Sequence, residues 1–221
     1  RRSSDLQLDL LPNGLKFAAW WEVRRTVTGK PEWVRHDLPI EIAGHGVGCG
    51  DINGDGRRDL VGPEGWLEAP VDPRRDRWIW HPDFKLDRDC GLPIFVHDVD
   101  ADGDADLIWG RGHRIGLYWM EQQVGADASV TWQRHAIDTS WSQPHSLLMA
   151  DINQDGQLDL VAGKRYMGHD GKDPGEYDPL VAFWYQFDRA THTWKRSPIS
   201  PGGPAGFGLD PQAVDLDMDG D

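Results

Sequence analysis

Four short segments of the chain place carboxylates at one shared spacing, which is a pattern that binds hard cations. The segments begin at Asp51, Asp98, Asp151 and Asp215, with Asp or Asn at the third position, Asp at the fifth and Gly at the sixth. The first three also carry Asp at the ninth position. The glycine permits the sharp turn that aims the oxygens at one point. Because a flexible, all-oxygen site favours calcium over zinc, we expect one Ca²⁺ per loop.

The expected ligands are the side chains at these positions together with a main-chain carbonyl at the seventh. Along the chain these residues are Asp51, Asn53, Asp55, Arg57, Asp59, Asp98, Asp100, Asp102, Asp104, Asp106, Asp151, Asn153, Asp155, Gln157, Asp159, Asp215, Asp217, Asp219 and Asp221. An EF-hand would need Glu at position twelve, which is Gly62, Trp109 or Ala162 here. A metal-free Asp-Gly turn is the other alternative, and four copies in one register argue against it.

Two histidines stand at matching places ahead of two of these loops. His45 and His145 each lie six residues before the first Asp of a loop, whereas Leu92 and Leu209 occupy the matching places elsewhere. The histidines are therefore not a rule of the repeat. Because residues there would begin the innermost strand of a blade, both imidazoles should converge on a central channel. There they could hold a further divalent metal ion or act as acid and base.

Further polar residues lie close to these histidines in sequence or in the repeat. Glu64, Arg111 and Lys164 each stand thirteen residues after a loop start, at the first turn beyond the inner strand. A polar cluster of mixed charge at the mouth of a channel suits a hydroxyl-rich ligand. The other candidates for it are Gln143, Arg165, Tyr166, His113 and His169.

The spacing of the loops indicates the elements that must position these residues. Loop starts are 47, 53 and 64 residues apart, close to the roughly 50 residues of a four-stranded propeller blade. Trp-containing segments recur in phase and predict outer strands at 33–36, 78–81, 132–135 and 194–196. Middle strands are expected at 65–68, 116–121 and 181–186, and a long loop at 167–179. We expect packing roles for most Trp residues and for His36, His81 and His135, and support of a calcium loop by His97.

These elements predict an all-β fold, a single and incomplete β-propeller domain over residues 1–221. About four blades are expected, with blade-start loops at 51–59, 98–106, 151–159 and 215–221. The fourth loop stops before its ninth position, so we expect a piece of a longer chain whose remaining blades pack on this one. The residues before Leu38 would end an earlier blade.

Composition narrows the classes of partner. The chain has 23 Lys and Arg residues against 37 Asp and Glu residues, a net charge of −14. This charge argues against nucleic acid and anionic membrane surfaces, which need basic patches. No apolar run is long enough for membrane insertion, and no signal peptide pattern is present. Because such loops bind calcium weakly enough to need extracellular or periplasmic concentrations, we expect a secreted or periplasmic protein.

The Asp-rich loops resemble FG-GAP/VCBS repeats, the calcium-loop blades of integrin heads and many bacterial secreted proteins. This resemblance covers nearly the whole chain and implies about seven blades in total. Three segments also resemble the propeller domain of aldos-2-ulose dehydratases: GHGVGCGD at 44–51, SQPHSL at 142–147 and GKRYMGHD at 163–170. That resemblance implies loss of water from a keto sugar such as 1,5-anhydro-fructose or glucosone. It also implies cupin domains after the propeller, which residues 1–221 do not contain.

Two functions from different classes follow. A carbon–oxygen lyase, a sugar dehydratase or isomerase, needs a base, an oxyanion stabiliser and an acid. We expect these roles at His145 or His45 (base or metal ligand), Lys164 or Arg165 (enolate stabiliser) and Tyr166 or His169 (acid). Substrate contacts are expected from Gln143, Arg111, His113 and Glu64. The alternative is a non-catalytic propeller that recognises a carbohydrate or a partner protein.

Overall fold

A computed structural model describes residues 8–218, so Asp219 and Asp221 of the fourth loop lie outside the described residues. The strands form four antiparallel sheets, and the helical content of this range is a single 3₁₀ turn, η1 (Ile40–Ile42). The all-β prediction is therefore confirmed.

Three of the sheets contain four strands each, connected in chain order from one edge to the other. The first sheet contains β3 (Gly48–Gly50), β4 (Asp59–Gly62), β5 (Gly65–Glu68) and β6 (Ile79–His81). The second contains β7 (Phe95–His97), β8 (Asp106–Gly110), β9 (Ile115–Val124) and β10 (Val130–Ser142). The third contains β11 (Ser146–Ala150), β12 (Asp159–Gly163), β13 (Val181–Asp188) and β14 (Thr193–Pro201). Such four-stranded antiparallel meanders are the blades of a β-propeller.

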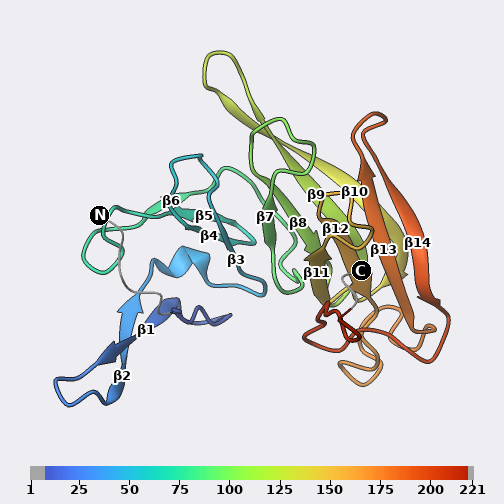
Figure 1. Cartoon of the computed structure of the whole chain (residues 1–221), viewed down its shortest axis with the longest axis horizontal. Coiled ribbons are helices and arrows are strands. Elements are labelled where there is room, and N and C mark those ends of the chain that lie inside the picture. Colours follow the sequence, from blue (N-terminus) through green and yellow to red (C-terminus); the bar gives the residue numbers. More distant parts are fainter. Residues whose placement is uncertain (1–7, 219–221) are drawn as a thin grey trace.

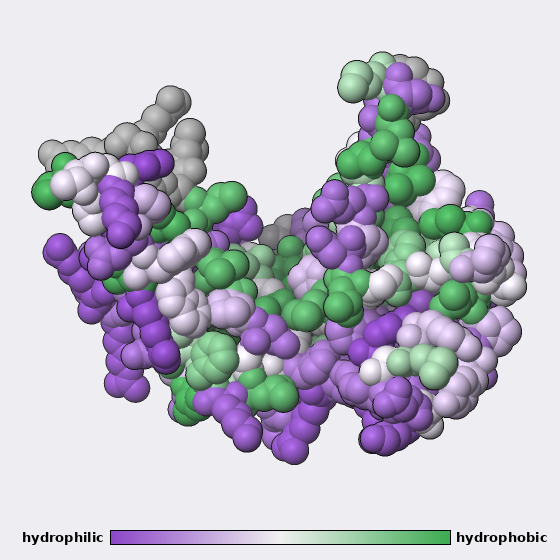
Figure 2. Space-filling view, turned by 90° about the horizontal axis from the view of Figure 1, so that it is seen from below, coloured by the Kyte–Doolittle hydropathy of each residue, from purple (hydrophilic) through white to green (hydrophobic). Residues whose placement is uncertain are grey.

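The fourth sheet is a hairpin of β1 (Ala19–Arg25) and β2 (Pro31–Asp37), which precedes the first complete blade. The sequence analysis interprets these residues, which precede Leu38, as the end of an earlier blade. The described residues thus contain three four-stranded sheets and one two-stranded hairpin. The sheets follow one another along an arc (Figure 1), and the space-filling view shows the concave outline that results (Figure 2).

Apolar side chains from neighbouring sheets form the core between the blades. Trp66 and Trp109 lie in the cluster between the first and second blades, and Trp119 and Trp141 lie in the cluster between the second and third. All four Trp side chains are buried. These four Trp residues therefore have the packing role that was expected for most Trp residues. The outer and middle strands also lie where the Trp pattern predicts them.

The inner ends of adjacent blades approach closely because glycine occupies the contact points. A Cβ atom on Gly48 would lie 1.9 Å from the carbonyl oxygen of Ile94, and one on Gly110 would lie 2.2 Å from that of Pro144. No larger residue fits there without moving the neighbouring backbone. This approach sets the first inner strand against the second and brings the segments before β3 and β11 toward the turn between β8 and β9.

Candidate functional site

The Asp-rich loops connect the first and second strands of each blade, and the ninth-position Asp is the first residue of the second strand. Asp59, Asp106 and Asp159 are buried, and one oxygen of each accepts a hydrogen bond from the amide of the second loop residue. The second oxygen of Asp106 accepts from the Gln122 amide at 2.8 Å, and that of Asp59 accepts from Ala69 at 2.8 Å. The ninth Asp therefore braces the loop against the third strand, a role that the ligand pattern alone did not indicate.

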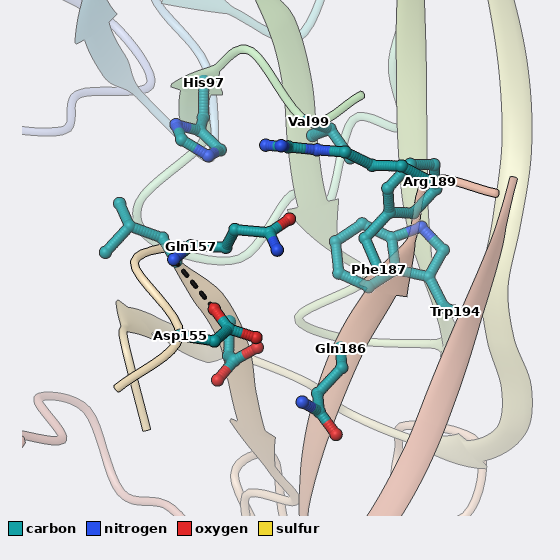
Figure 3. Close-up of a pocket in the computed structure, with 10 residues that line it drawn as sticks. His97, Val99, Asp155, Gln157, Gln186, Phe187, Arg189 and Trp194 are labelled. Atoms are coloured by element: carbon teal, nitrogen blue, oxygen red, sulfur yellow. Dashed lines mark hydrogen bonds between the residues drawn. The ribbon is translucent and has the colours of Figure 1, made fainter. Parts of the chain in front are cut away.

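The described loop residues share one backbone feature. The fourth position is left-handed in all four loops, with φ between 59° and 74° at Gly54, Ala101, Gln154 and Met218. The first Asp accepts from loop amides, as in Gly56 to Asp51 at 2.7 Å and Gly156 to Asp151 at 2.9 Å. Figure 3 shows the bond from the Gln157 amide to Asp155, which measures 2.9 Å. The turn thus gathers the carboxylates on one side of the backbone.

The donor set of these loops fits a calcium ion. Asp98, Asp100 and Asp106 each offer a carboxylate oxygen, and these oxygens lie within 4.8 Å of one another. Burial, with a contribution from Asp100, raises the pKa of Asp106 to about 7. A hard cation would stabilise such a crowded group of carboxylates. In the first loop the guanidinium of Arg57 contacts Asp55 and donates to the Ala69 carbonyl at 2.6 Å, so a positive charge already lies beside this loop.

His97, expected to support a calcium loop, lies opposite Asp106 in the pairing of β7 with β8. It also lines a small cavity between the second and third blades with Asp155 and Gln157 of the next loop. Arg189 extends toward His97 from the turn between β13 and β14 (Figure 3). His97 therefore lies between the second and third Asp-rich loops.

Three histidines converge at the opposite end of the blades. His45 precedes β3, His145 precedes β11, and His113 lies in the turn between β8 and β9. Each offers a ring nitrogen, and these nitrogens lie within 4.8 Å of one another. The strand β11 separates His145 from Asp151, and five residues of strand extend about 16 Å. The histidine cluster, defined as His45, His113 and His145, is thus at the other end of the blades from the Asp-rich loops.

The contacts of the histidine cluster hold the three rings with a nitrogen of each toward the others. Nδ1 of His45 donates to the Cys90 carbonyl at 2.6 Å, so its Nε2 is the nitrogen that faces the cluster. Nδ1 of His113 lies 3.0 Å from Oδ2 of Asp173, and its Nε2 faces Nε2 of His45 at 2.9 Å. Nδ1 of His145 is buried without a partner, and burial, followed by the positive charge of Arg165, lowers its pKa to about 4. Contact of the outer ring nitrogen with a carbonyl or carboxylate, as in His45 and His113, is the usual arrangement for a histidine that binds a metal.

A second group of residues adjoins the histidine cluster from the long loop between β12 and β13. Asp173 accepts from Arg165 at 3.1 Å and from His169 at 2.9 Å, and the His169 ring stacks on His113 with centroids 4.5 Å apart. Arg165 also lies within 3.4 Å of Gln143. Burial opposes ionisation of Asp173, but its bonds to His113 and His169 outweigh that effect and lower its pKa. The carboxylate therefore stays charged and orients both histidines.

Other candidate residues lie near this end but have different contacts. Lys164 is buried and donates to the carbonyls of Arg165 and Glu176 at 3.2 and 3.3 Å, which braces the long loop. Arg111 pairs with Asp89 at 2.7 Å. Glu64 pairs with Arg88 at 3.1 Å, and the Tyr166 side chain is exposed. The structure therefore brings together His45, His113, His145, His169, Arg165 and Gln143, and gives Lys164, Arg111, Glu64 and Tyr166 other contacts.

Two features were missed by the sequence reasoning. Asp173, which joins Arg165, His113 and His169, carries no sequence signal beyond its place in the long loop. The other is a Trp, Glu and His group that recurs from blade to blade. In the second blade the Trp119 and His135 rings stack with centroids 4.7 Å apart, and His135 lies 2.7 Å from Glu121. Its recurrence in two other sheets, as Trp20, Glu22 and His36 and as Trp66, Glu68 and His81, agrees with the structural role expected of these histidines.

Comparison with protein families identifies one part of the chain. Residues 98–162 match the FG-GAP-like repeat. This segment runs from the second Asp-rich loop through the third loop into β12, and the repeat supports the β-propeller interpretation of the four-stranded sheets. No curated protein gives a significant match, so the resemblance to aldos-2-ulose dehydratases rests on the three segments quoted above. None of the described residues forms a helix long and apolar enough to cross a membrane.

Proposed function

We propose that this β-propeller domain binds a divalent transition metal at the histidine cluster and a keto sugar beside it, which it dehydrates. The observation that carries the proposal is the convergence of His45, His113 and His145, each with a ring nitrogen within 4.8 Å of the other two. Three imidazole ligands with a further position left for a ligand are typical of catalytic zinc sites. A metal ion bound there would polarise a ketone oxygen of the sugar.

The residues next to the cluster have the chemistry that a dehydration needs. In this reaction a C–H proton beside the ketone is removed, the C–O bond at the next carbon breaks, and the departing hydroxyl takes up a proton to leave as water. Arg165 supplies a fixed positive charge for the enolate oxygen. The ring of His169, half exposed and bonded to Asp173 at 2.9 Å, can accept the first proton and return it to the hydroxyl. These contacts favour Arg165 over Lys164 and His169 over Tyr166 for the roles left open above.

Calcium has a structural role in this proposal. The clustered carboxylates of each Asp-rich loop would hold one ion and so fix the turn between the first and second strands. We also propose that the domain is exported, because calcium reaches the required concentration outside the cytoplasm, and that about seven blades close the ring.

A non-catalytic binding module is the second candidate. The observation that favours it is the mutual pairing of Arg165, Asp173, His113 and His169, which satisfies these groups without a substrate. Such a surface can hydrogen-bond a sugar with no proton transfer.

The test uses the protein with calcium and zinc present, incubated with 1,5-anhydro-fructose or glucosone. Growth of the ultraviolet band of a conjugated enone is expected, with a decrease of about 100-fold or more in His113→Asn. The control is His81→Asn, because His81, like His113, stacks on a ring and lies beside a carboxylate, but its ring partner is Trp66 and it lies outside the histidine cluster. A flat trace with both sugars, combined with measurable sugar affinity, would favour the binding module.

A further inference from the structure

A different cluster of ligand groups lies between the second and third blades, on the side of the Asp-rich loops. Asp100 belongs to the second loop, Glu121 to β9, and His192 to the turn between β13 and β14. Each offers one ligand atom, and these atoms lie within 4.8 Å of one another. Two blades therefore contribute to the group.

The side chains of this group are held in position before any ligand arrives. Oε2 of Glu121 accepts from His135 at 2.7 Å, and its Oε1 lies 3.5 Å from Nε2 of His192. The His192 ring packs against Trp119 and Phe187, with centroid distances of 5.0 and 5.3 Å. Its backbone is left-handed, with φ of 55°, in a tight turn. Aromatic packing thus fixes the imidazole with a nitrogen toward the carboxylates.

The blade repeat does not supply the full set, because Glu121 recurs in the first blade as Glu68 but is not accompanied there by counterparts of Asp100 and His192. The third loop position is Asn in the first and third loops, at Asn53 and Asn153. The residue two after the middle-strand Trp is Glu68 in the first blade and Gln186 in the third. The residue two before the outer-strand Trp is Val130 in the second blade, where the third has His192. Within residues 8–218 the full set therefore occurs between the second and third blades alone.

We propose that Asp100, Glu121 and His192 form a transition-metal site that joins the second and third blades. One imidazole nitrogen with two carboxylate oxygens suits zinc or a similar divalent ion, whereas a calcium site would be built from oxygens. Asp100 is also one of the three carboxylates gathered in the second loop with Asp98 and Asp106. The two sites therefore share this carboxylate, and the proposal is independent of the histidine cluster.

The test titrates the protein with Co²⁺, whose visible absorption reports ligand geometry, while excess calcium fills the oxygen sites. His192→Asn keeps a residue that tolerates the left-handed turn but removes the imidazole. This variant is expected to bind one equivalent of Co²⁺ fewer than the wild type. His113→Asn should instead lose the equivalent of Co²⁺ that binds at the histidine cluster. The two variants therefore distinguish failure of this proposal from failure of the proposed function. His81→Asn is the matched control and should keep the wild-type stoichiometry.

A second measurement needs no variant. The imidazole C–H resonances of His192 in the wild-type protein should shift or broaden on addition of one equivalent of Co²⁺ in excess calcium. Equal Co²⁺ stoichiometry in the wild type and His192→Asn, with unperturbed His192 resonances, would overturn the proposal and leave a simple ion pair between Glu121 and His192.

Discussion

The two ends of the blades follow different rules. At the loop end, Asp59, Asp106 and Asp159 have the same position in the repeat and make the same bond to the second loop residue. At the other end, His45 and His145 precede inner strands, while His113 comes from the turn between β8 and β9, and the shorter turn between β4 and β5, residues 63–64, has no histidine. The comparison teaches that the repeat carries the residues that hold each blade together, and that departures from the repeat carry the candidate chemistry.

Removal of calcium should have the largest effect and should act on the loop end alone. At a free calcium concentration 100 times the dissociation constant, each filled loop adds about 2.7 kcal/mol to the free energy of unfolding. We therefore expect EGTA to lower the melting temperature, by the same amount in the wild type and in His113→Asn. An unchanged melting curve in EGTA would contradict calcium binding by the loops.

Asp106→Ala should be the most damaging single substitution at the loop end. It leaves the amides of Val99 and Gln122 without their acceptor in a buried place, at about 1–3 kcal/mol each. A loss of about 2–6 kcal/mol is expected in urea unfolding with calcium removed. Asp102→Ala, in the exposed part of the same loop, is the control and should cost less than about 1 kcal/mol. Similar losses in the two variants would show that Asp106 does not brace the blade.

Asp138, between the second and third blades, should link stability to pH. Burial opposes its ionisation, but bonds from Ser140, Tyr185 and Arg196 outweigh that effect and lower its pKa. Its contribution is therefore fully present above the unfolded pKa of about 3.9 and is lost as the pH falls through the lower folded value. Asp138→Asn should cost about 1.5–3 kcal/mol at pH 7. The difference from wild type should shrink below pH 4, and a constant difference would count against this account.

His81→Asn should have the smallest effect and sharpens the contrast between repeated and unrepeated histidines. His81 is partly exposed and pairs with Glu68 at 2.9 Å, so its loss should cost less than about 1 kcal/mol. Turnover of the keto sugars should stay within a factor of two of the wild type. A large loss of turnover in this variant would contradict the view that histidines of the repeated group are structural and only the unrepeated histidines take part in the reaction.

The same contrast explains how much the sequence could predict. Strands, loops and blade order follow from a period near 50 residues, because each copy repeats the same local pattern. Lys164, Arg165 and Tyr166 are consecutive residues outside regular structure, and the sequence does not predict where their side chains lie. Lys164 is buried and bonds to the Glu176 carbonyl, Arg165 pairs with Asp173, and Tyr166 is exposed to solvent. The contact of His45 with His113 spans 68 residues and depends on how two blades pack. No periodicity in the sequence encodes that contact.

Because of Arg57, the first of the three complete Asp-rich loops carries a positive charge that the other two lack. The Arg57 guanidinium lies on Asp55, whereas Asp104 and Gln157 occupy the matching position in the next two loops. A calcium ion entering the first loop must displace a positive charge, and one entering the second meets an additional carboxylate. The loops should then fill in a fixed order, with the first loop last. The stability of the domain would then rise in steps as the calcium concentration increases. The domain would therefore respond to calcium over a wider range of concentrations than a domain with three equal sites.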